Sequence, residues 1–196
     1  IAYITSIIAS SRRDVLAASG NYGGELARLR SIYFKGMMEM NPDKQFYPDA
    51  NSTMRLTYGT VGNYKSWEGK PYKTQTWGTE ILAKEIPNDD EFHVPAKLKK
   101  LLENKDYGRY AQNGELPVWF LHNTDITGGN SGSPVINGNG ELIGIAFDGN
   151  WESMMSDLKF QDEYVRTISV DIRYVLFVID KYAGASNLIE ELTIVK

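Results

Sequence analysis

The residue of this chain most suited to chemistry is a serine set among glycines. In the run TGGNSGSPV, Ser131 follows Gly128 and Gly129 and precedes Gly132. A serine nucleophile needs an exposed hydroxyl on a tight turn, a base within hydrogen-bond reach, and backbone N–H groups aimed at the developing oxyanion. Because glycines let the backbone turn sharply, the N–H groups of Gly129 and Ser131 are the candidate oxyanion donors.

Two other motifs do not fit this spacing. The nucleophile elbow of α/β-hydrolases needs a glycine two residues after the serine, where this chain has Ser133, and it joins a strand to a helix. A phosphate-binding loop needs Gly-Lys before a Ser or Thr, and no lysine stands at this place. Taken alone, GGNSGS is also compatible with a glycine-rich loop that does no chemistry.

A base for this serine is not evident in the sequence. The chain has two histidines, His93 and His122. His122 follows the apolar run LPVWFL and is interpreted as structural, whereas His93 stands beside Pro95 and is expected to cap a short helix or to have no role. No cysteine is present, so disulfides and a thiol nucleophile are excluded. The histidines are isolated and no calcium-loop or HExxH spacing occurs, so we expect no metal and no cofactor.

Length and charge limit the class of protein further. The 196 residues are 42% hydrophobic and 12% aromatic, which is enough for a packed core in one large or two small domains. The net charge of -4 comes from interspersed acids and bases, so we expect no nucleic-acid binding. Arg12 and Arg13 end the apolar run IAYITSIIAS well short of the roughly 18 residues that a membrane span needs.

The first 40 residues have the pattern of helices. Apolar side chains in residues 25–40 recur at the spacing of one helix face, and residues 1–18 are expected to form another helix. The pattern then changes to runs rich in Thr, Tyr, Val and Trp, which predict short strands in residues 53–61 and 73–85. The sequence HVPAKLKKLLENKDYG predicts a short helix with Pro95 in its first turn.

The second half of the chain is expected to be mostly β. The run LPVWFL predicts a strand, and PVINGNGELIGIAF predicts a hairpin that turns at Asn137-Gly138, a pair that accepts positive φ angles. In DIRYVLFVIDKYAG, Asp171 is a plausible helix N-cap and Gly184 a plausible end, so a helix is favoured there over a strand. The fold class predicted from these patterns is mainly β with helices.

Three blocks of the sequence resemble one family. YPDANSTMRLTYGTV, TGGNSGSPVING with GELIGIAFDGNWESM, and SVDIRYVLFVIDKYAGA are similar, in this order, to the C-terminal part of the bacterial dipeptidyl-peptidase 7 and dipeptidyl-peptidase 11 family. These are serine exopeptidases with a chymotrypsin-like double barrel. The resemblance implies that residues 41–196 form the second β-barrel with a C-terminal helix, and that residues 1–40 are the tail of an inserted helical domain.

The resemblance also implies roles for the site residues. Ser131 corresponds to the family's nucleophile, and Gly129 with Ser131 to its oxyanion hole. Asp148 corresponds to an acid that helps to hold the free amino terminus of the peptide, and a carboxylate suits an ammonium group. A solvated turn residue is the alternative interpretation of Asp148.

Gly149 corresponds to the position that divides the family's specificities. An arginine at this place goes with acidic residues at the second position of the substrate, whereas a glycine goes with aliphatic or aromatic ones. We therefore expect a hydrophobic preference. Phe147 and Trp151 are candidates for lining the same pocket, with ordinary core packing as the open alternative.

In the family, the catalytic histidine and aspartate belong to the first barrel. The resemblance therefore implies that this chain carries only the nucleophile and is inactive alone. The expected partners are a peptide substrate and the missing N-terminal barrel and helical domain, in a homodimeric enzyme of the periplasm or cell surface of a Gram-negative bacterium. Two alternatives remain: a non-catalytic β-barrel module that binds a peptide at its sheet edge, and a complete small protease that uses His122 as its base.

Overall fold

The computed structural model of the chain describes residue 11, residues 22–44, residue 46, residues 52–156 and residues 159–195. The chain divides into two compact units, residues 1–54 and residues 55–196. The second unit contains every candidate site residue. Apart from residue 11, the helix predicted over residues 1–18 lies outside the described residues.

One long helix is described in the first unit. Helix α2 (Tyr22–Met40) confirms the helix predicted over residues 25–40 and begins three residues earlier. Phe34 of this helix packs edge-on against Phe46, with 5.3 Å between the ring centroids. The assignment of residues 1–40 to an inserted helical domain, and of residues 41–196 to a barrel, stays a prediction.

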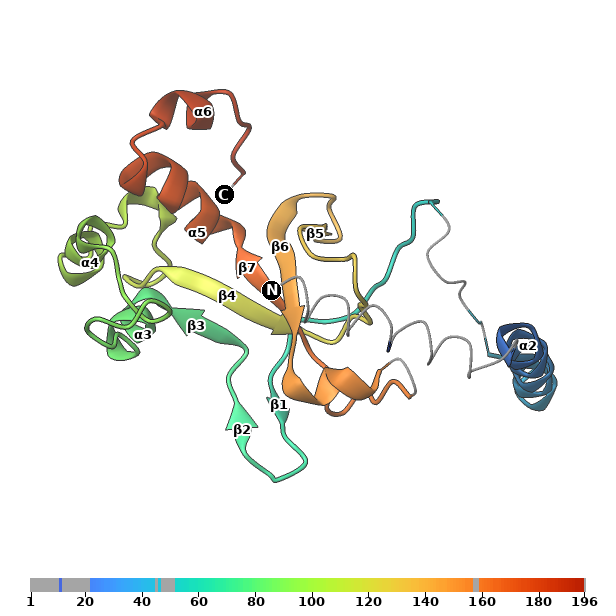
Figure 1. Cartoon of the computed structure of the whole chain (residues 1–196). Helices are drawn as coiled ribbons and strands as arrows, with labels where there is room; N and C mark the ends of the chain where they lie inside the picture. Colours follow the sequence, from blue (N-terminus) through green and yellow to red (C-terminus); the bar gives the residue numbers. More distant parts are fainter. Residues whose placement is uncertain (1–10, 12–21, 45, 47–51, 157–158, 196) are drawn as a thin grey trace. The chain divides into compact units, whose positions relative to one another are not determined.

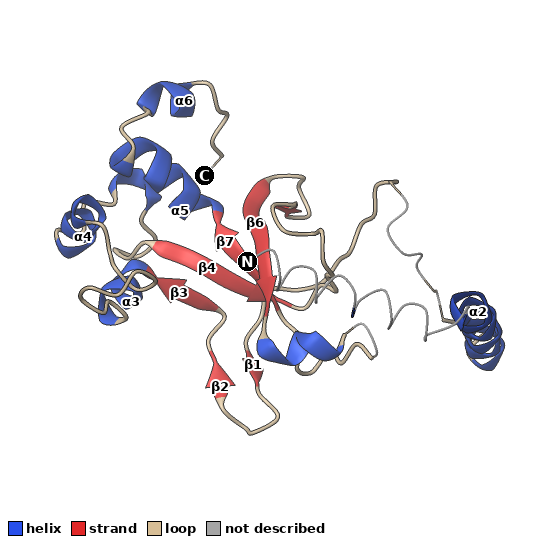
Figure 2. Cartoon of the chain, in the orientation of Figure 1, coloured by secondary structure: helices blue, strands red, loops and turns tan. Residues whose placement is uncertain are grey.

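A five-stranded antiparallel sheet forms the centre of the second unit (Figures 1 and 2). Its strands lie in the order β3-β4-β7-β6-β5. Their bounds are β3 Gln75–Trp77, β4 Pro117–His122, β5 Pro134–Ile136, β6 Leu142–Gly149 and β7 Thr167–Asp171. A separate two-stranded sheet pairs β1 (Tyr64–Lys65) with β2 (Pro71–Tyr72). Sheet and helices together confirm the predicted fold class, and β4 confirms the strand predicted at LPVWFL.

One predicted strand segment was wrong, and a second is confirmed only in part, by β3. Residues 53–61 form no strand, and their β-pairing is limited to an isolated bridge between Val61 and His122. The side chains of Leu56 and Tyr58 are 79% and 90% exposed, so this segment has no buried face to hold it in the sheet. In residues 73–85 the strand stops after Trp77 and helix α3 (Gly78–Ala83) follows. The backbone N–H of Trp77 donates to Glu80 Oε1 at 3.3 Å, which stabilises the start of this helix.

The predicted hairpin forms between β5 and β6, but its turn differs from the predicted one. The positive φ falls on Gly140, at +81°, and not on Asn137 or Gly138. The Gly140 N–H donates to the Asn137 carbonyl at 3.0 Å, and Asn137 Oδ1 accepts from the N–H groups of Asn139 and Glu141. The connection is therefore a longer loop that ends in a left-handed glycine.

The hydrophobic core of the second unit lies among the helices beside the start of β4 (Figure 1). These helices are α3, α4 (Ala96–Glu103), α5 (Ile172–Phe177), α6 (Ser186–Glu190) and the short 3-10 helix η1 (Gly108–Tyr110). The buried residues of the cluster are Leu102, Tyr107, Tyr110, Leu116, Leu176, Phe177 and Ile189. The core thus fixes one end of the sheet.

The predicted helices at residues 93–108 and 171–184 are confirmed, with α4 starting directly after Pro95. Asp171 is the N-cap of α5, because its side chain accepts the Arg173 N–H at 2.9 Å. The helix continues as a π-helical turn over Val178–Tyr182, and Gly184 follows with a φ of +74°. The expected end at a left-handed glycine is therefore present.

Candidate nucleophile site

Ser131 lies on the loop that joins β4 to β5. Gly129 and Gly132 have φ angles of +99° and +84°, a region that favours glycine, so the loop doubles back sharply on both sides of the serine. The loop is tied to β6, because the Gly132 N–H donates to the Ala146 carbonyl at 2.8 Å. This geometry leaves Ser131 exposed at the surface of the unit.

The two candidate oxyanion donors are unused. In the described part of the chain, the N–H groups of Gly129 and Ser131 donate no hydrogen bond, whereas the N–H of Asn130 donates to the Thr127 carbonyl and that of Ser133 to the Asn130 carbonyl. The Ser131 hydroxyl donates to the Phe147 carbonyl at 3.4 Å, a long and weak bond. Two free N–H groups beside an accessible hydroxyl are what an oxyanion hole and a serine nucleophile need.

A β-bulge places the neighbouring candidates beside this serine. Ala146 of β6 pairs with Ser169 of β7, and Asp148 pairs with Ile168, so Phe147 is an extra residue in β6. Bulges re-aim side chains, and here Phe147 and Asp148 are both exposed although they are consecutive in a strand. Ser131 contacts this strand at the Phe147 carbonyl, so Asp148 and Gly149 follow directly in the chain after the residue that the serine touches.

Asp148 is held in place through one carboxylate oxygen. Its Oδ1 accepts the N–H of Gly149 at 2.7 Å. Among the described residues no hydrogen bond to its Oδ2 is present, and the side chain is exposed. An anchored carboxylate with one open oxygen suits an ammonium group of a ligand.

The two aromatic candidates do not pack in the core. Phe147 is 60% exposed, and Trp151, the first residue of the 3-10 helix η2 (Trp151–Met155), is 75% exposed. Within the second unit, neither side chain is packed in the core, which was the alternative interpretation of both residues. Their apolar surfaces lie next to Asp148 and Gly149 in the chain, where they are available to a ligand.

Sequence reasoning missed a buried polar network that begins directly after Gly149 in the chain. Asn150 and Glu152 are each 7% exposed. Asn150 Nδ2 donates to the Tyr164 carbonyl at 2.7 Å and to Glu152 Oε2 at 2.9 Å, and the Tyr64 hydroxyl donates to the same carboxylate oxygen at 3.3 Å. Burial is the main reason that the pKa of Tyr64 is raised. An asparagine after a glycine normally indicates a surface turn, so no local signal pointed to this network.

The structure argues against His122 as the base for Ser131. The ring is 4% exposed, with Nε2 2.7 Å from Ser169 Oγ and Nδ1 2.8 Å from Thr124 Oγ1. Burial lowers the pKa of His122 to about 4. His122 is thus a neutral structural residue of β4, as predicted, with both nitrogens engaged away from the serine.

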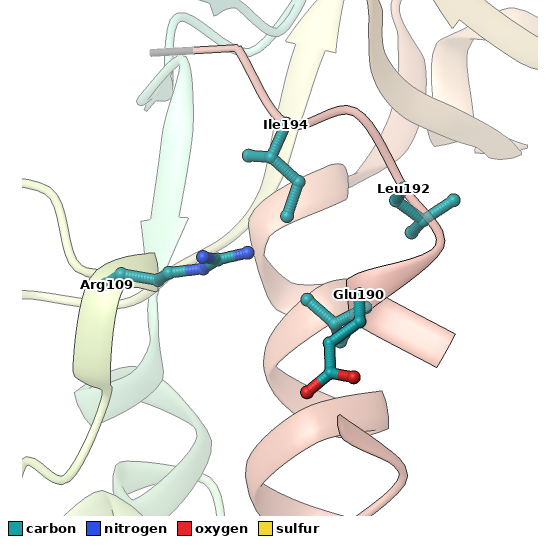
Figure 3. Close-up of a pocket in the computed structure, with 5 residues that line it drawn as sticks. Arg109, Glu190, Leu192 and Ile194 are labelled. Atoms are coloured by element: carbon teal, nitrogen blue, oxygen red, sulfur yellow. The ribbon is translucent and has the colours of Figure 1, made fainter. Parts of the chain in front are cut away.

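Other features of the described residues do not compete with this site. A surface hollow of about 340 Å³ is lined by Arg109, Ile189, Glu190, Leu192 and Ile194 and contains no predicted site residue (Figure 3). No group of three or more His, Asp or Glu side chains that could hold a metal ion occurs in the part of the chain that the structure describes. None of the described helices is long and apolar enough to cross a membrane.

The loop presents an exposed hydroxyl, two unused amide donors and an adjoining carboxylate, which are groups that serine hydrolases also use. Comparison with known proteins gives the family. A model of the peptidase S46 family matches residues 1–194, which extends beyond the blocks that carry the resemblance in the sequence. The chain belongs to the peptidase S46 family.

Relatives and solved structures agree with this assignment. Over 95% of this chain, the sequence is 54% identical to Dipeptidyl-peptidase 7 of Phocaeicola vulgatus. Over 99% of this chain, it is 42% identical to the Asp/Glu-specific dipeptidyl-peptidase of Flavobacterium psychrophilum. The crystal structure of Porphyromonas endodontalis DPP11 in complex with the dipeptide Arg-Glu matches 94% of the chain, with a TM-score of 0.86 and 40% identity. The chain spans about a quarter of these proteins, 26%, 27% and 26% respectively.

Proposed function

We propose that this chain is the part of a serine dipeptidyl-peptidase that carries the nucleophile. The observation that carries the proposal is Ser131 on its left-handed glycine loop, next to two unused amide donors and the bulged strand with Asp148. The membership in peptidase S46 supports a peptidase, and the names of the relatives support the release of dipeptides.

Each group has a step in this reaction. Ser131 Oγ attacks the carbonyl of the second residue of the peptide, and the N–H groups of Gly129 and Ser131 stabilise the resulting oxyanion. Asp148 binds the α-ammonium group, which limits the bound length to two residues before the cleaved bond. A base takes the hydroxyl proton and returns it to the leaving amine, and water then releases the dipeptide from the serine.

The base comes from outside these residues in this proposal. Both nitrogens of His122 are engaged elsewhere, and His93 is exposed beside α4 and has no bond to Ser131. The resemblance assigns the histidine and aspartate to a first barrel, and the relatives have about three quarters of their length beyond this chain. We propose the same arrangement here, in a homodimeric enzyme of the periplasm or cell surface.

The second position of the substrate is proposed to be hydrophobic. Gly149 presents no side chain and no charge to the pocket, and the exposed rings of Phe147 and Trp151 stand beside it in the chain. An apolar pocket favours aliphatic and aromatic side chains by removing their surface from water. An acidic side chain would lose its hydration there without gaining a cationic partner.

A chimera tests this function. This chain replaces the matching segment of Phocaeicola vulgatus Dipeptidyl-peptidase 7, and hydrolysis of fluorogenic dipeptidyl substrates is measured. We expect release from substrates with Ile, Met or Phe at the second position, and at least about 10-fold lower kcat/KM with Asp or Glu, because the pocket lacks a cation. Ser131→Ala is the inactive control. A folded chimera without Ser131-dependent hydrolysis of any dipeptidyl substrate would contradict the proposal.

A further inference from the structure

The glycine at position 149 is required for space and not for backbone conformation. Its φ lies outside the left-handed region, so an L-residue could adopt the same backbone. A Cβ built on Gly149, however, would lie 2.1 Å from Ser153 Oγ and 3.0 Å from Ser153 Cβ. Ser153 therefore occupies the volume that any side chain at position 149 needs.

Ser153 is itself held in place. Its hydroxyl donates to the Asn150 carbonyl at 2.6 Å, and its N–H donates to the same carbonyl at 3.0 Å. Rotating the Ser153 hydroxyl away would break its hydrogen bond to the Asn150 carbonyl. The Cβ of Ser153 would still lie 3.0 Å from a Cβ at position 149, which is closer than an ordinary contact. Ser153 thus blocks position 149 with an atom that its own hydrogen bond fixes.

The residue that anchors Ser153 is fully engaged. The Asn150 N–H donates to the Arg166 carbonyl at 2.8 Å, and Asn150 Oδ1 accepts the Arg166 N–H at 2.8 Å. Both hydrogens of its Nδ2 are used by Tyr164 and Glu152. Because Asn150 is buried and cannot turn without breaking these bonds, η2 cannot simply move away from Gly149.

We propose that Ser153 is a specificity-determining residue, which together with Gly149 sets the class of side chain that the pocket accepts. This inference rests on the proposed function. With Ser153 present, position 149 stays bare and the pocket takes an uncharged, apolar second residue. A cationic side chain at position 149, which would recognise an acidic second residue, fits only when position 153 is also made small. The two positions therefore change specificity as a pair.

The packing part of the proposal is tested in the 196-residue chain by a double-mutant cycle in thermal unfolding. We expect Gly149→Ala to lower the Tm by about 3 °C or more, because the methyl group overlaps Ser153. In a Ser153→Gly background the same substitution should lower the Tm by less than half as much. Equal shifts in the two backgrounds would overturn the proposal, because the two sites would then be independent.

The specificity part is tested in the chimera, as the ratio of kcat/KM for substrates with Glu and with Phe at the second position. We expect Gly149→Arg alone to lose activity on the Phe substrate while gaining little on the Glu substrate. Gly149→Arg combined with Ser153→Gly should hydrolyse the Glu substrate at least about 10-fold better than the single variant. If Ser153 had only a structural role, its substitution would change kcat/KM for the Glu and Phe substrates by the same factor.

The outcomes separate the two proposals. If Gly149→Arg alone accepts the Glu substrate as well as the double variant does, Ser153 is not a determinant, and the proposed function stands. If the unsubstituted chimera folds but hydrolyses no dipeptidyl substrate, the proposed function fails and the role of Ser153 in specificity fails with it. Coupled Tm shifts together with a switched substrate ratio support both proposals.

Discussion

At the scale of single residues, the loop around Ser131 depends on glycines that adopt a positive φ angle. Gly128 and Gly129 are adjacent and each has open space around the position of a Cβ, but only Gly129 has a positive φ, +99°. A side chain is therefore strained at Gly129 and tolerated at Gly128. This contrast gives a matched pair of substitutions next to the nucleophile.

We predict that Gly129→Ala lowers kcat of the chimera by about 100-fold or more, because strain displaces the N–H that is proposed to donate to the oxyanion. Gly128→Ala should stay within a few-fold of the unsubstituted enzyme. Steady-state kinetics on a Phe-containing dipeptidyl substrate measure both variants. If the two substitutions reduce kcat equally, the Gly129 N–H is not an oxyanion donor.

His122 makes the stability of the chain depend on pH. Its folded pKa of about 4 lies below the usual value of 6.5, so the unfolded chain binds a proton in this range that the folded chain does not bind. The corresponding stability is fully present above pH 6.5 and is lost as the pH falls towards 4. The loss is up to about 3 kcal/mol in the free energy of unfolding.

The prediction is checked by urea unfolding at pH 7 and pH 4.5. The unsubstituted chain should lose more stability between these values than His122→Gln does, because the variant has no buried imidazole to protonate. His93→Gln is the matched control, since His93 is exposed, and it should keep the pH dependence of the unsubstituted chain. Identical pH dependence in the His122 variant and the unsubstituted chain would refute the assignment.

The candidate site was partly predictable at this scale. The spacing of GGNSGS pointed to Ser131, Gly129 and their amide donors, because a tight turn next to a serine has a local signature. The partners of His122, Ser169 and Thr124, were not predictable, because cross-strand pairs depend on the register of β4 and β7. The contact of Ser153 with Gly149 depends likewise on how η2 folds back.

At the scale of elements, strong local signals predicted which elements form, although the hairpin turns at Gly140 and not at the predicted Asn137-Gly138. Helix α2, the hairpin of β5 and β6, and the N-cap of α5 each have a periodicity or a turn residue within a short window. Residues 53–61 have strand-like composition without a neighbour that buries them, and tertiary contacts decide such segments. The start of α3 is marked by Glu80, whose side chain accepts the Trp77 N–H. This residue lies in a run of β-branched and aromatic residues, which favour a strand, so the sequence did not indicate the helix.

We predict that Asp171→Ala destabilises the chain by about 2–4 kcal/mol. Asp171 is 3% exposed, caps α5, forms an ion pair with Arg173 and accepts from Gln75 Nε2 at 3.1 Å. Its removal uncaps the helix and leaves half-buried donors of Gln75 and Arg173 without this acceptor. Asp90→Ala, an exposed position, should change the free energy of unfolding by less than about 0.5 kcal/mol in the same urea titration. If Asp171→Ala and Asp90→Ala lowered the free energy of unfolding by the same amount, the cap at Asp171 would not stabilise the fold.

At the scale of the whole molecule, the residues of the candidate site lack a cover within the described part of the second unit. Ser131, Phe147, Asp148 and Trp151 are all exposed in the second unit, although a peptide pocket has to remove its ligand from water. The relatives, of which the chain spans about a quarter, have the length to supply the remaining walls and the base. Sequence patterns alone could not define such a pocket, because part of its lining is proposed to lie outside these residues.

The measurement that tests the central claim most directly is labelling of Ser131 with a fluorophosphonate probe, in the 196-residue chain and in the chimera. An unactivated serine hydroxyl reacts poorly at neutral pH, so we predict labelling of the chimera at Ser131, none of the chain alone, and none of either protein with Ser131→Ala. Circular dichroism confirms that each protein is folded. Labelling of Ser131 in the chain alone would show that these residues supply their own base and would contradict the account.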